Sequence, residues 1–262
     1  MRITLIGSGN VATQLGSAFQ RSEHSIVQVI SRNEKSGIAL AGKLKSDFTI
    51  DTKDATKVDC DLFLFAVKDS QIVEVAKEFK NTDKIILHTS GSIDVNVFKN
   101  KFKNYGVFYP LQTIKSNRNI NFKNVPICLE ASNSNTEQTL FKLAQSISEN
   151  IFMLNSEQRL RVHLAAVFAN NFTNHLYTLA EKILHQNHLP FELLKPLILQ
   201  TANNIKDKSP SLQQTGPAVR NDKITIKKHL QLLSSDKELQ KIYKLINDSI
   251  FKTHNKNLNS NP

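Results

Sequence analysis

The feature that most constrains the fold is a glycine-rich turn that directly follows a short apolar run. Residues 2–6 form an apolar run of strand length, and the pattern Gly7-x-Gly9-x-x-Ala12 comes immediately after it. Beyond the turn, apolar side chains recur at helical spacing through Phe19. A strand, a tight glycine turn and a helix in this order form the start of a βαβ unit. The sequence therefore predicts an α/β fold built on a parallel sheet.

Strands continue to alternate with helices up to about residue 154. A helix with Asp69 or Ser70 at its N-cap follows one of the strands, and another helix spans 132–149. The further runs of strand length lie at 25–30, 62–67 and 84–88, and short apolar segments around 107–108, 125–129 and 151–154 are expected to extend the sheet. This alternation is typical of a doubly wound, mostly parallel sheet, so we expect a Rossmann domain over residues 1–154.

The pattern changes at about residue 155, because from there on the apolar periodicity is helical without a strand-like break. The expected helices lie at 156–185, 190–206, 222–234 and 236–252. A polar tail over 255–262 is expected to be frayed. The sequence therefore predicts an all-α helical domain over residues 155–254.

The glycine turn has the composition of a dinucleotide-binding loop. Gly7 permits the tight turn, Gly9 lets a pyrophosphate approach the backbone, and Ala12 allows close packing of helix on strand. The following helix offers unpaired N–H groups and the positive end of its dipole to the phosphates. A glycine-rich turn that binds nothing is the alternative. The expected cofactor-binding residues of this loop are Gly7, Ser8, Gly9, Asn10, Val11 and Ala12.

The end of the second strand indicates which dinucleotide the loop prefers. Domains that prefer NAD carry Asp or Glu about 20 residues after the glycines, where the carboxylate accepts from the ribose 2′-OH. This chain has Ser31-Arg32-Asn33 there, followed by Lys35. A guanidinium at this place pairs with a 2′-phosphate and stacks on the adenine; a solvated surface arginine is the alternative. We therefore expect NADP(H), with Ser31, Arg32 and Asn33 at its adenosine end.

Three further loops follow strands of the predicted sheet, and ligands of open α/β sheets bind outside the carboxyl ends of the strands. We expect Ala66, Val67 and Lys68 near the phosphates and ribose of the cofactor. Ser90 lies in a hydroxyl-rich loop that suits the neighbourhood of the nicotinamide. The expected substrate-binding residues of these loops are Ser90, Gly91, Ser92, Tyr109 and Gln112. Ordinary turn chemistry at strand ends is the alternative for each loop.

Polar side chains gather on the long helix predicted over 156–185. His163, Asn170 and Asn174 are spaced i, i+7 and i+11, which puts them on one helical face. Asn171 lies about a fifth of a turn beyond that stripe. Since asparagine is a poor helix former, an adjacent pair indicates another role. A histidine beside an amide suits acid/base chemistry, so His163, Asn170 and Asn171 are the catalytic candidates; polar packing against a domain or partner is the alternative.

A dense polar loop at 214–222 precedes the third predicted helix of the second half. The Gly216-Pro217 pair fixes a turn, and Asp222 is placed to cap the helix. Arg220 offers a planar fork to a carboxylate or phosphate, so it is a candidate substrate-binding residue. A connecting loop with a surface arginine is the alternative.

Composition limits the partners of the chain. The formal net charge is +11, but the lysines are scattered, so we expect no nucleic-acid partner. No apolar run approaches the roughly 18 residues of a membrane span, and no signal-peptide pattern is present. Cys60 and Cys128 have no metal-type spacing, so we expect neither a metal site nor a disulfide framework. These features favour a soluble cytoplasmic protein.

Four segments together resemble a known two-domain family. They are Gly7–Ala12, Tyr109-Pro110-Leu111-Gln112-Thr113, residues 163–172 and residues 214–222. The family has a Rossmann-like domain followed by a helical domain of unknown function, and it is labelled an NADP oxidoreductase family. The resemblance covers nearly the whole chain; the last three segments are specific to it, whereas many dehydrogenases share the first.

The resemblance implies an activity and an assembly. The family is similar in architecture to pyrroline-5-carboxylate reductase, ketopantoate reductase, prephenate dehydrogenase and deazaflavin-dependent NADP oxidoreductase. That similarity implies hydride transfer in a cleft between the domains, and a homodimer built largely from the helical domain. The related β-hydroxyacid dehydrogenases use a Lys-x-x-x-Asn pair on the matching helix. With Asn171 in the Asn place, residue 167 is Val, so this lysine is missing and His163 is the candidate substitute.

Two hypotheses follow from the sequence. In the first, the protein is an NADP(H)-dependent oxidoreductase that transfers a hydride to or from a small, anionic substrate, either a carbonyl or imine or a hydroxy or amino acid. In the second, it is a catalytically silent NADP(H)-binding redox sensor or interaction protein, which the missing lysine favours.

Overall fold

The computed structural model describes residues 1–115 and 119–255, so the predicted tail beyond Asn255 lies outside the described residues. The chain divides into two compact units, residues 1–170 and 171–262, called here the first and the second unit. Each unit is described by itself. Strands give way to helices after residue 153, near the predicted change at 154, whereas the compact units divide within the long helical stretch that follows.

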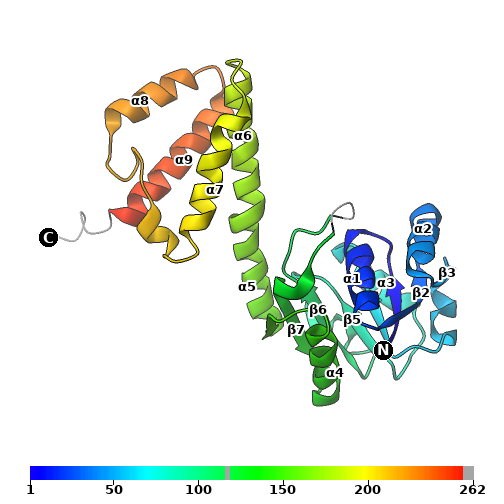
Figure 1. Cartoon of the computed structure of the whole chain (residues 1–262). Helices are drawn as coiled ribbons and strands as arrows, with labels where there is room; N and C mark the ends of the chain where they lie inside the picture. Colours follow the sequence, from blue (N-terminus) through cyan, green and yellow to red (C-terminus); the bar gives the residue numbers. More distant parts are fainter. Residues whose placement is uncertain (116–118, 256–262) are drawn as a thin grey trace. The chain divides into compact units, whose positions relative to one another are not determined.

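The first unit contains one sheet (Figure 1). It has eight strands in the order β3-β2-β1-β4-β5-β6-β7-β8. The strands are β1 (Arg2–Ile6), β2 (Ser25–Ile30), β3 (Asp47–Thr49), β4 (Leu62–Phe65), β5 (Ile85–His88), β6 (Tyr105–Pro110), β7 (Ile127–Ala131) and β8 (Ile151–Met153). All neighbouring pairs are parallel except β6 and β7. The order 3-2-1-4-5-6 is that of a Rossmann fold, with its switch point between β1 and β4. The predicted fold class is confirmed.

Helices cover both faces of the sheet, and the strands are apolar on both faces for that reason. The helices are α1 (Asn10–Arg21), α2 (Glu34–Leu44), α3 (Asp69–Glu78), α4 (Ser134–Gln145) and α5 (Ser156–Ala166). One core contains residues of α1, α2 and α4, and the other contains residues of α3 and of the 3-10 segment Val95–Phe98. This sandwich fixes the strand ends, where the expected ligand loops begin.

The long helix predicted over 156–185 is interrupted. A capping box of Asn155 and Gln158 starts α5, a π-helical segment (Val167–Phe172) follows, and α6 (Thr173–His185) continues the path. A π segment has more residues per turn than an α-helix, so side chains beyond it are rotated from the positions that a 3.6-residue period gives. The expectation that residues 163, 170 and 174 share one face assumed a regular α-helix through residue 185, and that assumption was wrong.

The second unit is all-helical. Beyond α6 it contains α7 (Lys195–Asn204), α8 (Lys223–Leu232), α9 (Lys237–His254) and the 3-10 segments Phe191–Leu194 and Pro210–Gln213. Asp222 caps α8 as predicted, because its carboxylate accepts from the backbone N–H of Thr225 at 3.0 Å. Among the described residues of this unit, Ala218 and Leu239 are the only buried apolar ones. The unit therefore has almost no core of its own.

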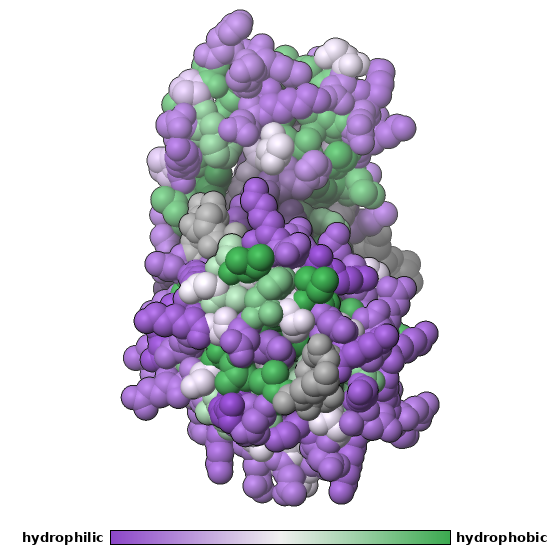
Figure 2. All heavy atoms as spheres, turned by 90° about the vertical axis from the view of Figure 1, so that its right-hand side faces the viewer, coloured by the Kyte–Doolittle hydropathy of each residue, from purple (hydrophilic) through white to green (hydrophobic). Residues whose placement is uncertain are grey.

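The surface of the molecule is mixed. Figure 2 shows hydrophilic side chains over most of the face that it draws, with hydrophobic side chains in separate patches between them. None of the described helices combines the length and the apolar character that crossing a bilayer requires.

Candidate functional site

A cavity of about 320 Å³ opens at the carboxyl ends of β1, β2 and β4. This volume lies in the range of small-ligand pockets. Nine of the expected cofactor-binding residues line it, namely Gly7, Ser8, Gly9, Ser31, Arg32, Asn33, Ala66, Val67 and Lys68. Ile6, Ile30 and Val75 also line it, together with four residues that the sequence did not single out, Ile50, Thr52, Gln71 and Glu78. The cavity lies at the switch point, where open α/β sheets bind ligands.

The two glycines of the loop have different physical roles. Gly7 has a φ of +106°, and a Cβ at this position would lie 2.5 Å from the carbonyl oxygen of Ala66. Only glycine therefore lets the turn pass the end of β4. A Cβ on Gly9 would meet no atom within 4 Å, so this side of the loop is open. Gly9 is the N-cap of α1 and provides no side-chain cap, which leaves N–H groups of the first turn for an anion.

Three serine hydroxyls connect the glycine loop to α2. The Oγ of Ser8 lies 2.8 Å from that of Ser31 and 2.7 Å from that of Ser36. The side chain of Asn33 caps α2 by accepting from the backbone N–H of Ser36. Arg32 is exposed at the mouth of the cavity. Sequence reasoning missed Ser36 because it missed α2, although an Asn-x-x-Ser spacing is a helix-start signal.

The remaining residues of the expected cofactor loop, and Gln112 of the expected substrate loop, have structural contacts. Ala12 is buried in the core and Val11 packs against it. The Asn10 side chain donates to the carbonyl of Ile114 at 3.2 Å, which ties α1 to the loop after β6. The side chain of Gln112 in that loop accepts from the backbone N–H of Thr113 at 2.8 Å.

The loop after β5 is held by its own hydroxyl groups. The buried Ser90 Oγ accepts from the backbone N–H groups of Ser92 and Ile93, both at 3.1 Å. The Ser92 hydroxyl donates to the carboxylate of Asp69 at 2.6 Å. Burial, with the positive charge of Arg159 second, lowers the pKa of His88 to about 3. The His88 ring is therefore neutral at physiological pH and is not suited to exchanging protons there.

Gly91, Tyr109 and His163 meet at the carboxyl edge of the sheet. The Tyr109 Oη lies 3.0 Å from the Nδ1 of His163, and the two rings are edge to face with centroids 6.0 Å apart. A Cβ on Gly91 would lie 2.7 Å from the Tyr109 Cζ and 2.8 Å from the His163 Nδ1. Residues of β6, α5 and the β5 loop, each a separate expectation of the sequence, are thus in direct contact. Burial raises the pKa of Tyr109 to about 12, so the phenol stays protonated.

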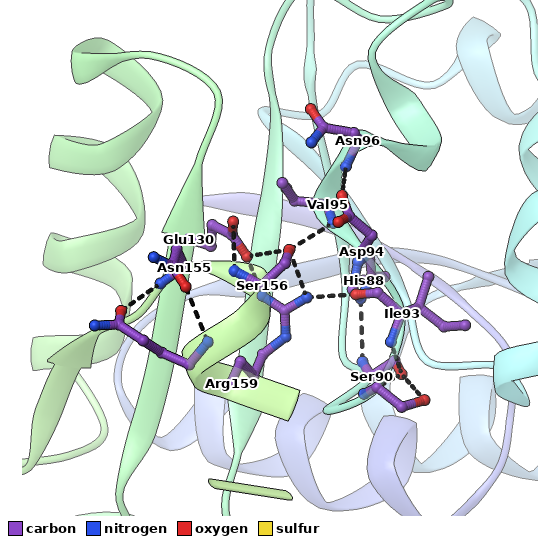
Figure 3. Close-up of polar contacts among 12 residues, drawn as sticks. His88, Ser90, Ile93, Asp94, Val95, Asn96, Glu130, Asn155, Ser156 and Arg159 are labelled. Atoms are coloured by element: carbon purple, nitrogen blue, oxygen red, sulfur yellow. Dashed lines mark hydrogen bonds and ion pairs between the residues drawn. The ribbon is translucent and has the colours of Figure 1, made fainter. Parts of the chain in front are cut away.

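A buried ion pair holds the start of α5, where Arg159 contacts Glu130 (Figure 3). The Arg159 guanidinium, 1% exposed, pairs with the carboxylate of Glu130 and donates to the carbonyl of Ile93. Ser156 joins the network, since its backbone N–H and its hydroxyl donate to Glu130 at 2.9 and 2.8 Å. The Ser156 Oγ in turn accepts from the backbone N–H of Val95 at 3.0 Å. Sequence reasoning missed this network entirely.

The remaining candidates lie beyond α5. The Asn170 side chain donates to the Thr113 Oγ1 at 2.7 Å, so it contacts the loop after β6. Asn171 and Arg220 are exposed residues of the second unit. The described residues contain no group of three or more His, Cys, Asp and Glu side chains placed to hold a metal ion.

Comparison with known proteins gives the family. A family model described as "NADP oxidoreductase coenzyme F420-dependent" matches residues 2–91, and one described as "Domain of unknown function (DUF2520)" matches residues 125–250. No curated protein matches the chain. The crystal structure of the candidate NADP oxidoreductase BF3122 from Bacteroides fragilis is 38% identical, with a TM-score of 0.87 over 96% of this chain and 98% of that one. The chain belongs to this family of two-domain NADP oxidoreductases.

Two more distant structures share the fold. The 1-pyrroline-5-carboxylate reductase from Streptococcus pyogenes is 15% identical, with a TM-score of 0.61 over 96% of this chain and 98% of that one. A reductive aminase from Aspergillus terreus, in complex with NADPH and ethyl-5-oxohexanoate, is 13% identical, with a TM-score of 0.68 over 96% of this chain and 94% of that one.

The predicted family and the predicted cofactor are confirmed: the protein is an NADP-dependent oxidoreductase. The cavity fits such a cofactor at its adenosine end, because it joins an open glycine loop to Arg32. This NADP oxidoreductase has Val167 at the position where the resemblance to β-hydroxyacid dehydrogenases places the lysine of a Lys-x-x-x-Asn pair. The lysine that the resemblance implies is therefore absent from this chain.

Proposed function

We propose that this NADP oxidoreductase transfers a hydride between the nicotinamide and a small, anionic substrate, reducing a carbonyl or imine or oxidising the matching hydroxy or amino acid. The observation that carries the proposal is the Gly91–Tyr109–His163 cluster at the same carboxyl edge of the sheet as the glycine loop. A hydrogen-bond donor at the edge of the sheet where the cofactor loop lies can polarise a C=O or C=N bond for hydride transfer.

The cofactor-side residues have distinct tasks. The N–H groups at the start of α1, with Gly7 and Gly9, hold the pyrophosphate. Arg32 neutralises the 2′-phosphate, and Ser31 and Ser36 donate hydroxyl hydrogen bonds near it. Lys68, the exposed N-cap of α3, adds positive charge at the cavity. The bound cofactor supplies the hydride from its nicotinamide ring.

The substrate-side residues complete the site. His163 donates a hydrogen bond to the carbonyl oxygen or imine nitrogen, which polarises the C=O or C=N bond, and Asn170 and Asn171 orient the same group. Arg220, an exposed residue of the second unit, stays our candidate for binding an anionic group. Gly91 and Ser92 form the floor of the site, with Ser90 fixed beneath them by its backbone contacts.

Turnover of NADPH tests the proposal. With a panel of keto acids and cyclic or amino-acid-derived imines, the purified protein is expected to oxidise NADPH with at least one member. His163→Ala is then expected to lower kcat by about 100-fold or more, the usual cost of removing one hydrogen-bond donor to the developing negative charge, with little change in NADPH affinity. His185→Ala, an exposed histidine at the end of α6, is the matched control and keeps the wild-type kcat.

A redox sensor is the second candidate, and Val167 in the lysine place is the observation that favours it. A sensor keeps NADP(H) binding, turns over none of the panel, and distinguishes NADP⁺ from NADPH in separate titrations. An enzyme turns over at least one substrate, and His163→Ala removes that turnover.

We also propose that two copies associate through the second unit. Large apolar side chains there are exposed in a single chain, among them Leu197 at 63%, Ile224 at 73% and Leu232 at 79%. A unit with so little core gains stability by burying such side chains against a second copy.

The two free cysteines, both buried, fit a reducing compartment, so we place the protein in the cytoplasm.

A further inference from the structure

The Tyr109–His163 contact leaves one ring nitrogen for a ligand. Tyr109 Oη and His163 Nδ1 are 3.0 Å apart, a normal hydrogen-bond distance. Within the described part of the chain, neither ring has another hydrogen-bond partner. The Nε2 of His163, on the opposite side of a half-buried imidazole, is therefore the atom that remains available.

The direction of this hydrogen bond follows from the two possible arrangements. If the Nδ1–H donated, the phenol hydrogen would lose its one neighbouring acceptor in a half-buried setting, which is unfavourable. If the phenol donates, both groups are satisfied at once. The raised pKa of Tyr109 means that the phenol carries the hydrogen that the second arrangement needs.

We infer that Tyr109 is a positioning residue that holds His163 in the tautomer with its proton on Nε2. The partner of one ring nitrogen sets which nitrogen carries the proton, so the phenol leaves the Nε2–H as a hydrogen-bond donor. The tautomer itself does not depend on the proposed function. Only the contact of the Nε2–H with the carbonyl oxygen or imine nitrogen of a substrate rests on it. It gives Tyr109 a different role from the substrate contact that the sequence indicated.

Gly91 sets the closeness of the pair. Because a Cβ there would lie within 2.8 Å of both rings, any larger residue separates the phenol from the imidazole or displaces both. The glycine in the loop after β5 is thus needed for the packing of Tyr109 and His163 rather than for loop flexibility.

The second unit contains a matched control. The Tyr243 Oη lies 2.9 Å from the Nδ1 of His229, and those rings are also edge to face, with centroids 5.7 Å apart. Tyr243→Phe therefore removes the same kind of hydrogen bond from another histidine without touching His163.

The test determines which nitrogen of His163 carries the proton, from long-range ¹H–¹⁵N spectra of the ¹⁵N-labelled, full-length protein. The spectra are recorded at a pH at which imidazole rings are neutral. His163→Gln assigns the signal among the eight histidines of the chain. We expect the Nε2–H form in the wild type. In Tyr109→Phe the ratio of the Nε2–H to the Nδ1–H form should fall about tenfold, the equilibrium factor of one neutral hydrogen bond. Gly91→Ala should give the same change, and Tyr243→Phe should change His229 alone.

A wild-type His163 protonated on Nδ1, or a tautomer ratio that Tyr109→Phe and Gly91→Ala leave unchanged, would overturn the assignment. The spectra need neither cofactor nor substrate. Failure of the proposed function, seen as no effect of His163→Ala on turnover, is therefore distinguishable from failure of the tautomer assignment.

Discussion

Replacing Arg159 with methionine is expected to lower the free energy of unfolding by about 3–5 kcal/mol, the usual loss when one member of a buried ion pair is removed. Arg159 is 1% exposed and its partner Glu130 has a side chain that is 14% exposed. Methionine fills similar space but leaves the Glu130 carboxylate without its cation, and the carbonyl of Ile93 without a donor. Urea unfolding followed by circular dichroism measures the change.

Two further variants show whether the loss in unfolding free energy comes from leaving the buried Glu130 carboxylate unpaired. Arg161→Met, two residues along α5, breaks an exposed pair with Glu157 in which both side chains are more than 70% exposed, and should cost at most about 0.5 kcal/mol. The double variant Arg159→Met/Glu130→Leu should recover most of the loss, because apolar replacement of both charges removes the uncompensated carboxylate. A loss below about 1 kcal/mol in Arg159→Met would show that the pair does not anchor α5.

Arg32→Ala is expected to weaken NADPH binding by about 30-fold and NADH binding far less, because NADH loses only the stacking on its adenine. The reason is loss of a charge-assisted hydrogen bond worth about 2 kcal/mol, which corresponds to that factor in Kd. Arg32 is exposed and lines the cavity, so its removal should not affect folding. Titration calorimetry with both dinucleotides measures the two affinities.

Matched variants make this result specific to the 2′-phosphate. Lys43→Ala removes a positive charge from the far end of α2 and should leave both affinities as they are. Arg32→Lys should recover only part of the NADPH affinity, because an ammonium lacks the planar fork of a guanidinium. An equal loss of NADPH and NADH binding in Arg32→Ala would place the arginine on another part of the cofactor.

The sequence predicted the fold where patterns were long or chemically distinctive. The glycine turn after β1 was such a case, and the buried strands β2, β4 and β5 were found within a few residues of their ends. It missed α2 and β3. Helix α2 contains Gly37, which suggests a break, yet a Cβ there would lie 2.2 Å from the ring of Phe48. That glycine is present for close packing of α2 on β3, a reason that only the three-dimensional structure reveals.

The sequence predicted the loops of the candidate site one by one, but it did not predict the contacts between their residues. Glu130 and Arg159 are 29 residues apart, and each alone has no distinctive pattern. A positive charge in the first turn of a helix is unfavourable with the helix dipole, and this was the one weak signal at Arg159. The π segment was unpredictable because its residues have no sequence signature, and it changes which side chains share a face with His163.

Calorimetric titration of the wild-type protein with NADPH and, separately, with NADH tests the central claim most directly. The account predicts one site per chain for NADPH and binding about 30-fold tighter than for NADH, the factor assigned to the 2′-phosphate contact. Absence of binding by either dinucleotide to well-folded protein would contradict the assignment of the glycine loop as the cofactor site. Equal or tighter binding of NADH would contradict the role of Arg32.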